Sequence, residues 1–299
     1  MNAKQHDTKA LQDLDKQHYM HPFTDSKAMH KKGTRIITGA DGCYIYDSEG
    51  GKVLDGMAGL WCVAIGYGRH ELADVAAQQM RELPYYNSFF GTAHPPVIKL
   101  AAQLKKLAPA HISHVFFTGS GSESNDTNVR LVRHYWQAKG QPKKRTIISR
   151  YNAYHGSTMA AMSLGGMKGM HDQGGIIDGI EHIMQPHWYH ETLAGESEED
   201  FGLRAAQALE TKILEVGADH VGAFIGEPVQ GAGAVIVPPT SYWPEIQRIC
   251  DKYEILLIAD EVITGFGRTG NWFGSTTMGI RPDIITIAKT LTSGYIPMG

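Results

Sequence analysis

Short runs of apolar residues recur from about residue 115 to the end of the chain, and amphipathic segments separate them. A strand that is apolar on both faces needs cover on both sides, and the helices between the strands of a parallel sheet supply that cover. The alternation therefore predicts an α/β fold. The predicted strands are residues 115–119, 145–149, 221–228, 255–262 and 283–289.

Three segments between these runs have the spacing of amphipathic helices. In the first of them Val129, Val132, Tyr135 and Trp136 are expected on one face. Gly217 follows the second and is a plausible C-cap, because glycine tolerates the backbone conformation that ends helices. The predicted helices are residues 125–140, 201–217 and 241–253.

The N-terminal part of the chain has a different pattern. Residues 40–56 alternate apolar and polar positions around a Ser-Glu-Gly-Gly turn, which is typical of an antiparallel hairpin. We predict that residues 1–70 contribute to a smaller domain and that residues 71–299 form a large domain. Residues 170–200, rich in His, Gly and acidic side chains, are predicted to be long connecting loops.

Composition excludes some classes of function. A formal net charge of −3 over 299 residues gives no general attraction to nucleic acid or to an anionic membrane. The first residues are polar and lack the apolar core of a signal peptide, and no apolar run is long enough for a membrane span. Cys43, Cys62 and Cys250 are too few and too widely spaced for a disulfide framework. We expect a cytoplasmic protein with reduced thiols.

The chain has 15 histidines, which raises the question of a metal centre. Neither the HExxH nor the CxxC spacing occurs, and His187 and His190 have the spacing of a surface loop. We predict no metal site.

The segment TGSGSESND, residues 118–126, joins a predicted strand to a predicted helix. Its Gly and Ser residues allow backbone N–H groups to converge on an anion at the helix N-terminus, and Ser120 and Ser122 could add hydroxyl donors. Such turns are also common helix caps without any ligand. Taken alone, the segment does not distinguish a phosphate site from a cap.

Asp260 ends a strongly apolar strand, where an ionised carboxylate is costly without a partner. One interpretation is a cap for the following turn. The other is an anion that faces the pyridinium nitrogen of pyridoxal 5′-phosphate (PLP) and keeps that nitrogen protonated, with Val262 packed against the ring.

Lys289 comes at the end of the last apolar run. An apolar environment favours the neutral amine that a Schiff base requires, although a lysine can also lay its stem on apolar surface and extend its head into water. In YNAYHGST, Tyr154 could stack on a cofactor ring, and Gly156 allows a close approach of the chain. The functional hypothesis depends on all of these elements occurring at the ends of successive strands, where open α/β sheets place their ligands.

Longer strings carry a resemblance to a known family. The chain resembles the class III aminotransferases of PLP fold type I, in the ω-amino acid and amine:pyruvate branch, and HPFTD, VRHYW, YWPEI and SGYIPMG look most like its putrescine or polyamine type. The resemblance covers essentially the whole chain. Its strings include LWCVAIGYGR, ELPYYNSFFGTAHPP, FFTGSGSESND, YHGSTMAAMSLGGMKGMH, GEPVQGAGAVIVPP, IADEVITGFGRTGNWFG and IAKTLTSGYIPMG.

The resemblance implies a role for each matching residue. Lys289 carries the cofactor and moves the proton, Asp260 pairs with the ring nitrogen, and Tyr154 is the third catalytic residue. Tyr154 and Val262 enclose the ring, and Glu227 lies close to the cofactor and to a mobile arginine. The implied cofactor-binding residues are Ser120, Gly121, Ser122, Tyr154, His155, Glu227, Asp260, Val262 and Lys289, and the implied amine pocket is Phe23, Trp61, Phe89 and Ala232.

The resemblance also implies a mostly parallel seven-stranded sheet with a smaller α+β domain, and a homodimer with its site at the interface. The implied reaction passes the amino group of an amine, diamine or ω-amino acid to a keto acid, with pyruvate expected, giving an aldehyde or ketone and L-alanine. The sequence leaves open an aminomutase, a decarboxylating aminotransferase and an inactive PLP-binding paralogue.

This chain departs from the family pattern in a few places. Ser124, Thr264 and Thr290 replace a common Ala, Cys and Gly, and YNAYHG differs from the frequent WNGYHG. The chain ends at Gly299, whereas the family continues with a further C-terminal part, so we expect a fragment of a longer enzyme.

Overall fold

The computed structural model describes residues 6–299. By its internal contacts the chain divides into two compact units, one ending at Pro84 and one running from Tyr85 to Gly299. The expected domain boundary at residue 70 stays a prediction. Within the described part of the chain, no helix combines the length and the apolar character needed to cross a membrane.

The first unit contains a three-stranded antiparallel sheet in the order β1-β2-β3. The turn between β2 and β3 is closed by Asp47, whose Oδ1 accepts hydrogen bonds from the backbone N–H groups of Glu49 and Gly51. The hairpin predicted for residues 40–56 is confirmed. The elements of this unit are α1 (Thr8–His18), α2 (Ser26–Lys32), β1 (Ile37–Asp41), β2 (Tyr44–Asp47), β3 (Lys52–Leu54), α3 (Ala58–Trp61) and α4 (His70–Glu82).

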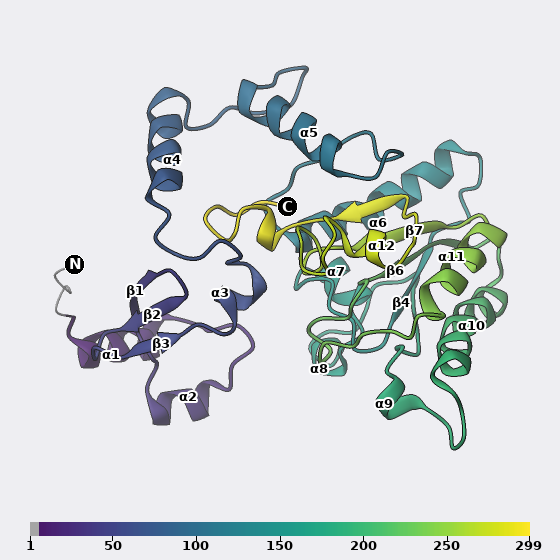
Figure 1. The fold of residues 1–299 in the computed structure, drawn as a ribbon, viewed down its shortest axis with the longest axis horizontal. Helices are drawn as coiled ribbons and strands as arrows, with labels where there is room; N and C mark the ends of the chain where they lie inside the picture. The colour runs from purple at the N-terminus through teal and green to yellow at the C-terminus, as the bar shows by residue number, and fades with distance from the viewer. Residues whose placement is uncertain (1–5) are drawn as a thin grey trace. The chain divides into compact units, whose positions relative to one another are not determined.

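The second unit is built on a parallel sheet in the order β5-β4-β6-β7-β8 (Figure 1). The α/β fold class is therefore confirmed. Its strands are β4 (Thr146–Arg150), β5 (Ile180–Ile183), β6 (Val221–Gly226), β7 (Leu256–Asp260) and β8 (Ile284–Thr286). Its helices are α5 (Pro95–Leu107), α6 (Gly121–Ala138), α7 (Met159–Leu164), α8 (Lys168–His171), α9 (Trp188–Glu191), α10 (Glu198–Val216), α11 (Tyr242–Lys252) and α12 (Gly274–Thr277).

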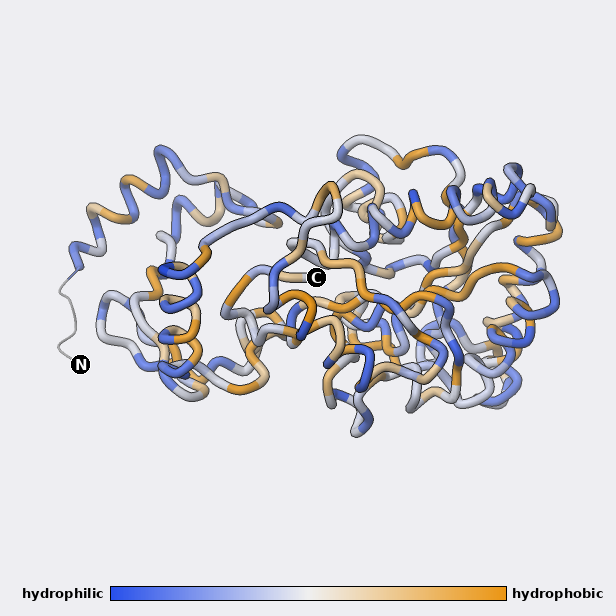
Figure 2. Tube along the Cα trace, turned by 90° about the horizontal axis from the view of Figure 1, so that it is seen from above, coloured by the Kyte–Doolittle hydropathy of each residue, from blue (hydrophilic) through white to orange (hydrophobic). Residues whose placement is uncertain are grey.

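Successive residues of each strand face opposite sides of the sheet, and each side has its own helices. Ile147 packs in a cluster with residues of α6 and α7, whereas its neighbour Ile148 packs with residues of α10 and α11. Phe224 of β6 is fully buried in the second cluster, a burial worth about 2–3 kcal/mol. In Figure 2 the hydrophobic colour follows the inner strands of this unit and the hydrophilic colour its outer helices. All three predicted helices are confirmed, and Gly217 is the C-cap of α10.

The described residues contribute five strands to the parallel sheet, and the expected total of seven stays a prediction. Three expectations about this unit are wrong in detail. Residues 115–119 form no strand, because the backbone hydrogen bonds of this segment to another part of the chain are confined to Thr118, which pairs with Gly299. The predicted loop of residues 170–200 contains β5, whose Glu181 and His182 are half-buried at a sheet edge and so lack an apolar pattern. Tyr135 is 40% exposed, because it lies about 100° around the helix from buried Trp136.

The loop that follows β4 is folded back tightly on itself. Asn152 donates its backbone N–H to the carbonyl oxygen of Gly166, and Gly166 donates to the carbonyl oxygen of Ala153. A Cβ atom at Gly166 would lie 2.1 Å from the carbonyl oxygen of Arg150. This close backbone contact fixes the path of the chain that leads to Tyr154.

Candidate active site

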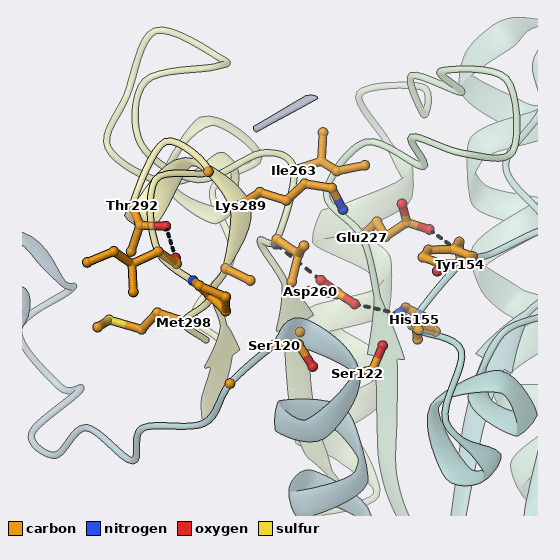
Figure 3. A pocket seen from close by; sticks show the side chains of 18 residues that line it. Ser120, Ser122, Tyr154, His155, Glu227, Asp260, Ile263, Lys289, Thr292 and Met298 are labelled. Atoms are coloured by element: carbon orange, nitrogen blue, oxygen red, sulfur yellow. Dashed lines mark hydrogen bonds and ion pairs between the residues drawn. The ribbon is translucent and has the colours of Figure 1, made fainter. Parts of the chain in front are cut away.

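A cavity of about 320 Å³ lies where β6 and β7 end, next to the N-terminus of α6 and the segment after β8. Figure 3 shows the side chains that line it. All nine residues expected to bind a cofactor line this cavity: Ser120, Gly121, Ser122, Tyr154, His155, Glu227, Asp260, Val262 and Lys289. Sequence reasoning missed other lining residues, among them Ile263, Thr292, Ile296 and Met298.

One wall of the cavity is the start of α6. Ser120 is the N-cap, and its hydroxyl accepts from the N–H of Glu123 at 3.2 Å, so the capping interpretation is confirmed. Gly121 has no room for a side chain, because a Cβ there would lie 2.9 Å from Cγ2 of Val262. The N-terminus of this 18-residue helix carries a partial positive charge. The cap uses the N–H of Glu123, and other N–H groups of the first turn remain. This wall can therefore still bind an anion.

Ser122 and Gly156 meet on the neighbouring wall. Gly156 has φ +138°, a conformation open mainly to glycine, and a Cβ there would lie 2.5 Å from the Ser122 hydroxyl. The same hydroxyl accepts from the backbone N–H of Ser157 at 3.1 Å. The close approach expected for Gly156 is therefore confirmed, and it holds the loop with Tyr154 against α6.

Asp260 is the last residue of β7 and is only 4% exposed. Its Oδ2 lies 2.7 Å from Nδ1 of His155 and accepts from Nδ2 of Asn125 at 2.9 Å. Its Oδ1 accepts from the N–H of Val262 at 3.1 Å. The partners that a carboxylate at the end of an apolar strand requires are thus present.

Asn125 was not among the sequence candidates. It is fully buried on α6, and its Oδ1 accepts from Nδ2 of Asn128 at 3.1 Å and from the hydroxyl of Thr286 at 2.9 Å. Asn128 also donates to the Thr286 hydroxyl at 2.8 Å. The sequence does contain a signal for this cluster, because Asn125 and Asn128 are polar residues on the apolar side of a predicted helix and Thr286 is a polar residue inside an apolar strand.

Glu227, directly after β6, presents a second buried carboxylate to the cavity. It accepts from the backbone N–H groups of Tyr154 at 3.2 Å and Gly231 at 2.8 Å. Burial raises the pKa of its carboxyl group, and Asp260 acts in the same direction. The charges of His155 and Arg150 oppose that rise.

Lys289 begins a short 3₁₀ turn three residues beyond β8, rather than ending the strand itself. It is half-buried, and its φ of +43° is unusual for a residue with a side chain. Such backbone strain is concentrated at functional sites. In Figure 3 the amine end of Lys289 points towards the side of the cavity that holds Glu227 and Tyr154.

Tyr154 lies opposite, on the loop after β4, and burial raises the pKa of its hydroxyl. Val262 lines the same cavity from the turn after β7. The two side chains that were expected to enclose a ring therefore share one cavity, while their contact with a ring stays a prediction.

The four residues expected in an amine pocket come from both units of the chain. Phe23 and Trp61 belong to the first unit, and Phe89 and Ala232 to the second. Neither Phe89, which is 69% exposed, nor Ala232 is among the residues that line the cavity. Their role stays a prediction. Within residues 6–299, no three His, Cys, Asp or Glu side chains are grouped so as to hold a metal ion.

Comparison with known proteins places this arrangement in a family. The sequence model of the family described as aminotransferase class-III matches residues 26–299. The chain is a class III aminotransferase by family. Two curated members are similar in sequence. A putrescine--pyruvate aminotransferase of Pseudomonas aeruginosa is 61% identical over 300 residues, covering 100% of this chain and 65% of that protein. A diaminobutyrate--2-oxoglutarate transaminase of Halomonas elongata is 47% identical, covering 88% of this chain and 57% of that protein.

Solved structures of class III relatives have the same fold. An omega transaminase from Pseudomonas jessenii in complex with PMP matches with a TM-score of 0.95 and 48% identity, covering 96% of this chain and 64% of the other. An (S)-enantioselective omega-transaminase from Thermomicrobium roseum matches with a TM-score of 0.96 and 44% identity, covering 99% of this chain and 66% of the other. The chain thus spans about two thirds of the length of these class III proteins.

Proposed function

We propose that this class III aminotransferase chain is the PLP-binding part of an enzyme that transfers the amino group of an amine to a keto acid. The observation that carries the proposal is one cavity that joins Lys289, Asp260 and the N-terminus of α6 at the ends of parallel strands. An amine, a buried carboxylate and an anion-binding helix end match the aldehyde, ring nitrogen and phosphate of PLP. The Pseudomonas jessenii relative was solved with PMP, the amino form of this cofactor.

The residues present fit PLP in size and chemistry. Gly121 and Gly156 leave space where any side chain would collide with Val262 or Ser122. Nε2 of His155 is buried without a hydrogen-bond partner, so polar capacity remains next to Asp260. When bound, PLP supplies an electron sink for the negative charge that develops at the amine carbon.

The protein's own groups supply the remaining chemistry. We infer that Lys289 would hold the cofactor through Nζ, and that its amine, when free, would act as the general base that moves a proton at the amine carbon. Asp260 would face the ring nitrogen and favour the protonated form of that nitrogen. Ser120, Ser122 and the N–H groups of Gly121 and its neighbours hold the phosphate. Tyr154 and Val262 orient the ring and exclude water from its faces.

Putrescine is the proposed amine donor and pyruvate the proposed acceptor. The support is the 61% identity to the Pseudomonas aeruginosa protein over the whole of this chain. We also propose a homodimer with its site at the interface and a cytoplasmic location, supported by the family resemblance and by three cysteines that are free in the structure.

The test uses the product of the complete reading frame, loaded with PLP. The absorbance band of the lysine-bound cofactor is recorded, putrescine is added without any keto acid, and pyruvate follows. We expect the band to bleach with putrescine and to return with pyruvate. Lys289→Ala should give no such band, whereas Lys168→Ala, which removes an exposed amine, should behave as the wild type.

The outcomes separate the alternatives. An unchanged band with putrescine on a protein that holds PLP would reject this donor. Recovery with 2-oxoglutarate but not with pyruvate would favour the acceptor named for the Halomonas elongata relative. Product formation that needs no keto acid would indicate an aminomutase or a decarboxylating reaction instead.

A further inference from the structure

A chain of buried polar side chains connects Asp260 with strand β8. It runs from Thr286 through Asn128 and Asn125 to the carboxylate, and each of these four side chains is at most 6% exposed. Buried polar groups are costly unless they are fully hydrogen-bonded. A network of this kind inside an apolar interior therefore calls for a function beyond packing.

The direction of every hydrogen bond in the network follows from one backbone group. The side-chain amide of Asn125 lies 2.8 Å from the carbonyl oxygen of His155, which can only accept. The atom there is consequently the nitrogen, and Oδ1 faces the other way, towards donors on Asn128 and Thr286. A flipped amide would place oxygen against oxygen at His155 and nitrogen against nitrogen at Asn128.

This direction constrains Asp260. The Asn125 nitrogen is also 2.9 Å from Oδ2 of Asp260, so Oδ2 must accept. His155 cannot impose this by itself, because a ring nitrogen donates or accepts according to its tautomer. With Oδ2 bonded to two partners, Oδ1 has only the N–H of Val262. Figure 3 shows this carboxylate between His155 and the Lys289 side of the cavity.

We propose that Asn125 is a positioning residue that engages Oδ2 of Asp260 and so leaves Oδ1 to accept from the cofactor's ring nitrogen, with Asn128 and Thr286 locking the orientation of its amide. The inference rests on the proposed function, since it concerns the same cofactor. It adds Asn125 as the group that requires Oδ2 of Asp260 to accept a hydrogen bond.

The test measures dissociation constants for two probes, PLP and 1-deaza-PLP, in which a C–H group replaces the ring nitrogen. A partner of the ring nitrogen improves binding of PLP alone, whereas general damage to the cavity weakens both probes. The wild-type protein should prefer PLP. In Asn125→Ala this preference should fall by about tenfold, the order of one hydrogen bond to a charged group.

A milder variant covers the case in which Asn125→Ala does not fold. Thr286→Val keeps the side-chain shape but removes the hydroxyl that orients Asn125, and it should reduce the preference by a smaller factor in the same direction. Thr264→Val is the matched control, because Thr264 is equally buried but donates to Glu261 instead of the network. It should leave the preference unchanged.

The results distinguish the two proposals. A wild type that binds neither probe would overturn the proposed function and this inference with it. A wild type that prefers PLP, with the same preference in Asn125→Ala and Thr286→Val, would overturn the inference alone. A fall in Thr264→Val as large as in Thr286→Val would also overturn it, because the effect would then be one of packing.

Discussion

Asp260 and Glu261 are neighbours in the chain, and both are almost completely buried, yet their surroundings differ in kind. Asp260 is bonded mainly by side chains that come from other elements, namely Asn125 and His155. Glu261 accepts from the hydroxyl of Thr264 and from the backbone N–H groups of Gly274 at 2.8 Å and Ser275 at 2.6 Å. Asp260 lines the cavity, and Glu261 does not.

The difference separates a carboxylate that faces the cavity from one that holds a loop in place. Consecutive residues at a strand end point to opposite sides. Both oxygens of Glu261 are used to close the segment of residues 261–275, which carries Val262 and Ile263 into the cavity. Asp260 keeps an oxygen that has only a backbone partner. We expect loss of Asp260 to affect the reaction and loss of Glu261 to affect stability.

Asp260→Asn should give the largest effect, a fall in kcat/KM of about a thousandfold or more, because the charge that favours a protonated ring nitrogen is removed. The melting temperature of the PLP-free protein should fall by only a few degrees, since an asparagine oxygen still accepts from Asn125 and His155 while the N–H of Val262 loses its acceptor. Steady-state kinetics and thermal melting measure the two effects. A large loss of stability with normal kinetics would contradict the comparison.

Glu261→Ala should give the next largest effect, a fall in the free energy of unfolding of about 3–5 kcal/mol, because buried donors lose their acceptor. Urea denaturation of the PLP-free protein measures this change. Glu261→Gln retains one acceptor oxygen and should recover part of the loss. If either variant abolished activity at unchanged stability, Glu261 would belong to the reaction after all.

Glu227 should give the smallest effect, one that depends on pH. Its raised pKa means that the folded state binds this proton more tightly than the unfolded state does. The resulting stability is fully present below the pKa of the unfolded state, near 4.5, and is lost as pH rises through the pKa of the folded state. The loss is about 1.4 kcal/mol for each unit by which the two pKa values differ.

Glu227→Gln removes the titrating carboxyl group. The free energy of unfolding of this variant should therefore change less between about pH 5 and pH 8 than that of the wild type. Urea denaturation of the PLP-free proteins across this range checks the expectation. The exposed Glu199→Gln is the control and should follow the wild-type curve. A wild type that gains stability relative to Glu227→Gln as pH rises would reverse the assigned sign.

The sequence allowed the parallel sheet and its main helices to be predicted, because strands such as β6 and β7 are apolar on both faces and α6, α10 and α11 are amphipathic. It also allowed Asp260 and Lys289 to be singled out as polar residues in apolar surroundings, whereas Glu227 and His155 were expected only from the family resemblance. The edges of the sheet were predicted poorly in both directions. β5 was missed because it is half-exposed, and residues 115–119 were predicted as a strand because their side chains are apolar.

The Asn125 network could not be predicted for a different reason. In the sequence, Asn125, Asn128 and Thr286 are only polar residues at apolar positions of a helix and a strand. Their hydrogen-bond partners depend on the packing of α6 against β7 and β8. The orientation of an amide is fixed by its neighbours in space, here the carbonyl group of His155. The orientation of the Asn125 amide therefore cannot be predicted from residue spacing in the sequence.

Gly166 has a consequence for how mutational data on this protein should be interpreted. A Cβ atom there would lie 2.1 Å from the backbone oxygen of Arg150, so even alanine would force the backbone to shift. In a saturation scan this glycine should tolerate substitution as poorly as Lys289 does, although it touches no reacting group. Intolerance therefore marks crowded backbone as readily as catalysis, and only a purified variant that is folded but inactive separates the two.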